Sequence, residues 1–76
     1  MRYVQYYHKQ GDKLVEACGD RAVVILDGRN TIETSKQDAV KFNGYRRPRY
    51  DGFQIWEGDT FTRSKPITNI IKGETK

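Results

Sequence analysis

Short β-rich runs separated by turn signals dominate the hydrophobic pattern of this chain. The turn signals are the Gly-Asp pairs at Gly11-Asp12, Gly19-Asp20 and Gly58-Asp59, together with Asp27-Gly28. Gly followed by a polar residue suits a type II′ hairpin turn, and Asp-Gly suits a type I′ turn or a turn with a bulge. In the first half of the chain, the pattern predicts strands at residues 2–8, 13–18, 21–26 and 30–33, joined by such turns.

The strand predicted at residues 21–26 differs from the others. It contains Ala-Val-Val-Ile-Leu at positions 22–26, with no alternation of apolar and polar side chains. Such a run is typical of a strand that is covered on both faces. We therefore expect it at the centre of the sheet, beneath a second layer.

A short helix is predicted directly downstream. Residues 34–38 are typical of a helix start, because Ser35 and Asp38 have the spacing of a capping box. An apolar face follows, and Gly44 provides a C-terminal stop. A helix this short is not stable alone in water, so it should dock on the sheet through Ala39 and Phe42.

The last part of the chain returns to strands. Residues 52–57 alternate Phe53 and Ile55 with Gln54 and Trp56, and the Gly-Asp turn then leads to a return strand at residues 60–64. Pro66 ends that run or marks a sheet edge. The segment with Ile67, Ile70 and Ile71 fits either a final short strand or a single helical turn. Residues 72–76 are expected to be a frayed tail.

The order of these elements predicts one α+β domain over residues 1–76. Strands, one short helix and further strands indicate a small antiparallel sheet of about five to six short strands with the helix packed on it. A small SH3-like barrel is the alternative, because short strands joined by tight turns also build barrels. The chain lacks the spacing of a β-α-β unit, so a parallel sheet is not expected.

Composition narrows the functional classes. The chain has no apolar run near the ~20 residues of a membrane helix and no signal-peptide pattern, which favours a cytoplasmic domain without a membrane partner. Cys18 and His8 are the only residues of their types, so we expect no disulfide, metal or cofactor. A Cys-His nucleophile would lack an orienting third group, and the Asp residues of the four turns form no acid-base pair. These observations argue against an enzyme.

The positive charge is concentrated in the second half of the chain. The net charge is +4, and residues 39–76 hold eight basic and four acidic residues, whereas residues 1–38 hold six of each. Part of the excess lies in Tyr-Arg-Arg-Pro-Arg-Tyr at positions 45–50. Arg side chains can fork onto phosphate or carboxylate oxygens or stack on a base, and tyrosines can add stacking platforms. The simpler alternative is a solvated loop whose Arg stems cover the sheet edge.

Two further aromatic features allow more than one interpretation. Tyr3 and Tyr7 share one face of their strand and Tyr6 lies opposite. Tyr3 and Tyr7 could stack bases, but the pattern favours a cross-strand aromatic pair in the core, because the paired aromatic motifs of an RNA-binding sheet are missing. Trp56 lies opposite Phe53 and Ile55, so it is either an outward interface anchor or a cover for the helix side of the sheet.

The sequence therefore favours a non-enzymatic module that docks on nucleic acid or a nucleoprotein through the basic loop at residues 45–50. The candidate binding residues are Lys41, Tyr45, Arg46, Arg47, Arg49, Tyr50, Trp56, Arg63 and Lys65. The alternative is a small inhibitor or regulator of the kind encoded by phages or mobile elements, for example in anti-defence. It would engage an acidic or nucleic-acid-binding protein with Arg, Tyr and Trp anchors. A third alternative is a homodimer that pairs an edge strand at residues 2–8 or 60–64.

Overall fold

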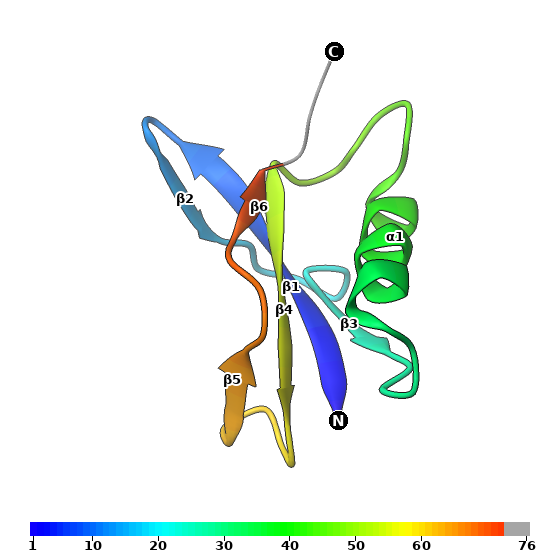
Figure 1. The fold of residues 1–76 in the computed structure, drawn as a ribbon. Helices are drawn as coiled ribbons and strands as arrows, with labels where there is room; N and C mark the ends of the chain where they lie inside the picture. Colours follow the sequence, from blue (N-terminus) through cyan, green and yellow to red (C-terminus); the bar gives the residue numbers. More distant parts are fainter. Residues whose placement is uncertain (73–76) are drawn as a thin grey trace.

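The computed structural model describes residues 1–72 and shows a curled antiparallel sheet with one helix on one face (Figure 1). The elements are β1 (Arg2–Gln10), β2 (Lys13–Glu16), β3 (Val23–Leu26), α1 (Ile32–Asn43), β4 (Gly52–Gly58), β5 (Ser64–Pro66) and β6 (Ile71–Lys72). Every strand pairing is antiparallel. The predicted α+β class is therefore confirmed. No helix within residues 1–72 is long and apolar enough to cross a membrane.

Two long strands form the centre of the sheet. β1 pairs with β4 from Arg2 opposite Glu57 to Tyr7 opposite Gly52. On the other side of β1 lie both β2 and β3, and on the other side of β4 lie both β5 and β6. Each outer position is thus an interrupted strand. Residues 2–8 are central, so the alternative of a dimer that pairs through them as a free edge is wrong.

The interruption between β2 and β3 is centred on Tyr6. The Ala17 N–H donates to the Tyr6 carbonyl oxygen at 3.0 Å, and the Tyr6 N–H donates to the Ala22 carbonyl oxygen at 2.8 Å. Residues 18–21 therefore loop out as a wide insertion, and the Gly19-Asp20 turn does not make a hairpin. The Gln5 side-chain amide donates to the carbonyl oxygens of Tyr6 at 2.9 Å and of Ala17 and Ala22 at 3.4 Å. Insertions of this kind bend a strand and increase its twist, which fits the curl of the sheet.

The helix begins earlier than the sequence predicts. Thr31 is the N-cap, and its hydroxyl accepts a hydrogen bond from the Thr34 N–H at 3.1 Å. The predicted strand at residues 30–33 and the capping box between Ser35 and Asp38 are therefore wrong. The Asp27-Gly28 turn leads into this helix and does not form a hairpin. At the other end, Gly44 has φ 103° and its N–H reaches the carbonyl oxygens of the last turn, so the predicted stop is confirmed.

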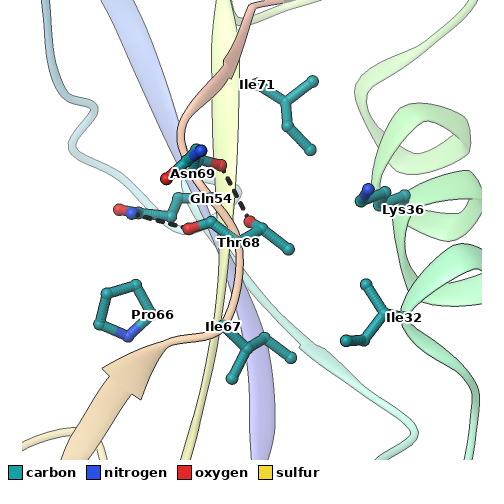
Figure 2. A pocket seen from close by; sticks show the side chains of 8 residues that line it. All are labelled: Ile32, Lys36, Gln54, Pro66, Ile67, Thr68, Asn69 and Ile71. Carbon is teal, nitrogen blue, oxygen red and sulfur yellow. Dashed lines mark hydrogen bonds between the residues drawn. The ribbon is translucent and has the colours of Figure 1, made fainter.

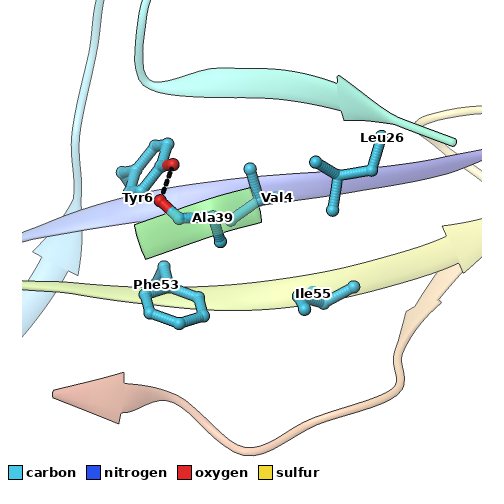
Figure 3. Close-up of a cluster of buried hydrophobic side chains, with 6 residues drawn as sticks. All are labelled: Val4, Tyr6, Leu26, Ala39, Phe53 and Ile55. Atoms are coloured by element: carbon cyan, nitrogen blue, oxygen red, sulfur yellow. Dashed lines mark hydrogen bonds between the residues drawn. The ribbon is translucent and has the colours of Figure 1, made fainter. Parts of the chain in front are cut away.

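The hydrophobic core lies between the helix and one face of the sheet (Figure 3). It consists of Val4, Tyr6, Leu26, Ala39, Phe53 and Ile55. The Tyr6 hydroxyl donates to the Ala39 carbonyl oxygen and links β1 to the helix. Ala39 is fully buried, as predicted, but Phe42 is 51% exposed and does not dock. Ser35 is also fully buried, and its hydroxyl accepts a hydrogen bond from Arg2 of β1, so the helix contacts the sheet there as well.

The outer strands differ most from the predictions. β3 is an edge strand and Ile25 is 58% exposed, so the expected central position is wrong. Val24 and Leu26 contact the core, while Val23 and Ile25 alternate onto the opposite face. The predicted strand at 60–64 is a turn, and β5 starts at Ser64 opposite Gly58. Pro66 ends this edge strand as predicted, and Ile71 belongs to a strand. Residues 73–76 of the predicted tail lie outside the described residues.

Candidate nucleic-acid interface

The basic loop between α1 and β4 is held at both ends by Asn43. The Asn43 side chain donates to the Tyr50 carbonyl oxygen at 3.1 Å and accepts from the Tyr50 N–H at 2.9 Å. Its backbone carbonyl oxygen accepts from the Arg49 N–H at 3.1 Å. Asn43 is 7% exposed, so these bonds are shielded from water. The backbone of the loop is therefore ordered by contacts that leave the Arg side chains uninvolved.

The side chains of this loop point into solvent. Arg46, Arg47 and Arg49 are exposed, and no carboxylate within residues 1–72 forms an ion pair with them. Tyr45 is 74% exposed, and Lys41 is exposed in the last helical turn. The C-terminal end of a helix carries partial negative charge, so an anion would be attracted here by the side chains and not by the helix. These five exposed residues of the loop and the last helical turn are together called the Arg loop surface.

Tyr50 has a structural role. Its ring stacks on Tyr6 with centroids 5.0 Å apart and an angle of 18°, and the His8 ring lies 4.9 Å away on a tilted plane. Burial raises the pKa of Tyr6, and the neighbouring Tyr50 adds to this shift. Tyr50 therefore fixes the end of the loop against β1 and is not available as a free stacking platform.

The remaining predicted site residues lie elsewhere. Arg63 and Lys65 are exposed near the β4–β5 turn, at the far end of β4 from the Arg loop surface (Figure 1). Seven residues of strand separate the two ends, a distance of about 20 Å. Trp56 is on the face opposite the helix, because Phe53 and Ile55 contact the core. The structure thus groups only part of the predicted set.

A groove beside the helix was not found by sequence reasoning. Three adjoining hollows of about 580, 290 and 330 Å³ lie between α1 and the β5–β6 segment, and Figure 2 shows the largest. They share lining residues, so they form one continuous groove that reaches Tyr45. Its walls include Ile32, Lys36, Val40, Ile67, Phe53, Ile71 and Lys72. The signal in the sequence was the isoleucine-rich segment at residues 67–71, because Ile67 and Ile71 line this groove.

The face opposite the helix carries an aromatic layer. Tyr3 and Trp56 are directly paired across β1 and β4, and their rings are 6.2 Å apart at 7°. Tyr3 and Tyr7 are buried, at 7% and 6% exposure, so the predicted packing role of these tyrosines is confirmed. Phe61 packs edge-on to Tyr3 at 4.8 Å, a contact that the sequence did not indicate because Phe61 lies in a turn.

Not every buried polar group of this layer has a hydrogen-bond partner within residues 1–72. The Tyr7 hydroxyl donates to the Gln54 side-chain oxygen at 2.8 Å. Burial raises the pKa of Tyr7 and the Glu16 carboxylate adds to the increase. The Trp56 indole N–H opposes this shift, but its geometry falls short of a hydrogen bond, and Nε1 is buried without a partner among residues 1–72. An unpaired buried donor of this kind costs about 1–3 kcal/mol.

Cys18 and His8, to which the sequence assigns no catalytic role, lie in different surroundings. Cys18 is exposed in the insertion between β2 and β3, and the His8 ring packs near Tyr50. Within residues 1–72, no group of three or more His, Cys, Asp or Glu side chains could hold a metal ion.

Comparison with known proteins provides no family for this chain. No protein-family model matches it, and neither the curated proteins nor the solved structures contain a significant match.

Proposed function

We propose that this protein is a non-enzymatic module that binds single-stranded nucleic acid through the Arg loop surface. The observation that carries the proposal is a set of three solvent-facing guanidinium groups without ion-pair partners within residues 1–72, on a loop whose backbone Asn43 holds in place. Because the loop is ordered before binding, less conformational entropy is lost when the arginines contact phosphates.

Single strands suit this surface better than duplexes. Arg46, Arg47, Arg49 and Lys41 would contact backbone phosphates, and Tyr45 would stack on an unpaired base. The groove continues from Tyr45 along the helix, with an apolar floor at Phe53 and cations at Lys36 and Lys72. Exposed base edges and rings of a single strand could follow such a groove, whereas a duplex keeps its bases stacked.

Binding should show a strong dependence on salt. Four phosphate contacts correspond to a slope of about −3 in a plot of log affinity against log salt for a single strand. The test is fluorescence anisotropy with a labelled single-stranded oligonucleotide at several salt concentrations. The variant R46Q/R47Q/R49Q should abolish most binding at moderate salt and reduce the slope by about 2. Y45A should weaken binding with little change in slope, because stacking releases no counterions.

A charge-matched control separates a local site from net charge. K9Q/K13Q/R21Q removes three exposed cations from the β1–β2 hairpin and the insertion, and leaves the same net charge as the Arg loop variant. It should bind nearly as well as the unchanged protein. Equal loss in both triple variants would contradict the proposal, because attraction would then depend on overall charge. Absence of binding at low salt would also overturn it and favour an acidic protein as the partner of this loop.

A further inference from the structure

The open face of the sheet contains a second, chemically different recess. It has a volume of about 500 Å³ and is lined by Tyr3, Gln5, Glu16, Val23, Trp56 and Phe61. We call it the aromatic recess. Although the chain has a net charge of +4, the charged residue lining this recess is a carboxylate, and no Lys or Arg of residues 1–72 lines it. The groove beside the helix, in contrast, is lined by Lys36 and Lys72.

The aromatic walls come from three separate segments that meet at Tyr3. Trp56 from β4 is parallel to the Tyr3 ring, and Phe61 from the β4–β5 turn meets it at 66°. The walls therefore present ring surfaces in two orientations. The faces of aromatic rings carry negative electrostatic potential and attract cations, with Trp the strongest of the three.

A chain of hydrogen bonds fixes these walls. The Ser64 hydroxyl donates its one proton to the Phe61 carbonyl oxygen at 2.9 Å. The Tyr3 hydroxyl lies 2.7 Å from Ser64 Oγ. Because Ser64 has already donated its proton, the Tyr3 hydroxyl donates and Ser64 Oγ accepts. This links the Tyr3 ring to the turn that carries Phe61, so the recess is formed in the absence of any ligand.

We propose that the aromatic recess binds a basic side chain, lysine or arginine, presented by a segment of a partner protein. The ammonium or guanidinium group would lie over the rings of Trp56 and Phe61 and face the Glu16 carboxylate, while its aliphatic stem packs on Val23. The recess lies on the face opposite the helix, so this interaction is independent of the nucleic-acid site proposed above.

Trp56 is the only tryptophan of the chain, and so it reports directly on this recess. The test uses three short peptides of identical sequence whose central residue is lysine, trimethyl-lysine or norleucine. Norleucine keeps the apolar stem but lacks the charge. Binding is followed by Trp56 emission and by the indole N–H resonance in a ¹⁵N-labelled sample. Both cationic peptides should cause saturable changes, and the norleucine peptide should not.

Two carboxylate variants test whether Glu16 is the carboxylate that attracts the lysine of the peptide. E16Q should weaken binding of the lysine peptide roughly fivefold, the effect of one carboxylate near a solvent-exposed cation. E33Q, which changes an exposed carboxylate on the helix, should leave it unchanged. R46Q/R47Q/R49Q should also retain peptide binding, so failure of this inference and failure of the nucleic-acid proposal are distinguishable. Equal binding of the norleucine peptide would overturn the proposal in favour of an apolar docking site. An absence of saturable change with all three peptides would overturn it altogether.

Discussion

Arg2 joins four parts of the fold, and its removal offers a sharp test of how the domain is held together. Its guanidinium donates to the Glu57 carboxylate at 2.8 and 3.1 Å, to the Ser35 hydroxyl at 3.0 Å and to the Asn30 carbonyl oxygen. These contacts connect β1 to β4, to the helix and to the turn that precedes the helix. Arg2 is 8% exposed, so the cluster is largely shielded from water.

The variant Arg2→Met keeps an apolar stem of similar length and removes all the donors. The Ser35 hydroxyl and the Asn30 carbonyl oxygen then lose a partner, which costs about 1–2 kcal/mol each. The Glu57 side chain is 42% exposed and can be hydrated, so loss of its ion pair adds only about 0–1 kcal/mol. Together these terms predict a decrease of about 3 kcal/mol in the free energy of unfolding. That is a large share of the stability of so small a domain.

Urea denaturation followed by circular dichroism measures this difference. In a thermal melt, the melting temperature should fall by roughly 12–24 °C, because a loss of 1 kcal/mol lowers it by about 4–8 °C in a domain of this size. Arg29→Met is the matched control, because the Arg29 side chain is 91% exposed and its ion pair to Asp27 is local. It should change the free energy of unfolding by less than about 0.5 kcal/mol. Equal stability of the two variants would refute the assigned role of Arg2.

Two further predictions concern stability. Because burial raises the pKa of Tyr6 above its ordinary 10.0, the folded state holds the proton more tightly than the unfolded state. Stability should be retained below pH 10 and then fall by up to about 1.4 kcal/mol per pH unit, and urea titrations from pH 8 to 11 should show a smaller decline in Y6F. A Cβ atom at Gly58 would lie 2.1 Å from the Arg63 carbonyl oxygen, whereas one at Gly28 would meet nothing within 4 Å. G58A should therefore destabilise the protein by about 1–3 kcal/mol, and G28A should be neutral or stabilising by about 0.4–1 kcal/mol; similar melting curves for both would contradict this reasoning.

The three Gly-Asp pairs show why local signals predicted turns but not connections. Gly11-Asp12 forms the expected two-residue hairpin, with Gln10 opposite Lys13. Gly11 has φ 63° and Asp12 has a negative φ, which fits the type II′ turn. Gly19-Asp20 instead lies in the insertion opposite Tyr6, and Gly58-Asp59 begins a longer turn that ends at Ser64. The dipeptide determines that the chain bends, whereas pairing with distant residues of β1 and β4 determines what the bend connects.

The start of the helix illustrates the same limit. Thr31 and Ser35 are both good N-cap residues, and the sequence offers no local reason to prefer one. In the structure Ser35 is fully buried and its hydroxyl accepts from Arg2, which is thirty-three positions away. A buried position inside the helix is incompatible with a role as the cap. The choice depends on a tertiary contact that no short segment contains.

The candidate surfaces also differ in how far the sequence predicts them. The Arg loop surface was predictable because Arg46, Arg47 and Arg49 are adjacent in sequence and cannot be buried without partners. The groove beside the helix and the aromatic recess each combine segments that the topology brings together. Phe61 reaches Tyr3 only because the β4–β5 turn folds back over the open face. Glu16, which looks unremarkable in a strand, gains its proposed role only because it lines the recess beside these rings.

The interrupted outer strands favour binding of any partner through side chains over binding through strand addition. Edge pairing needs a run of free backbone N–H and C=O groups. Within residues 1–72, no outer strand exceeds four residues, and β5 ends in Pro66, which cannot donate a backbone hydrogen bond. A homodimer through an edge would gain few hydrogen bonds on either side. What the described chain does present is two surfaces of contrasting chemistry, a cationic loop at one end of the helix and an aromatic recess with a carboxylate on the opposite sheet face. If both proposals hold, nucleic acid and a basic protein segment can bind at the same time, because neither occupant lies on the surface used by the other.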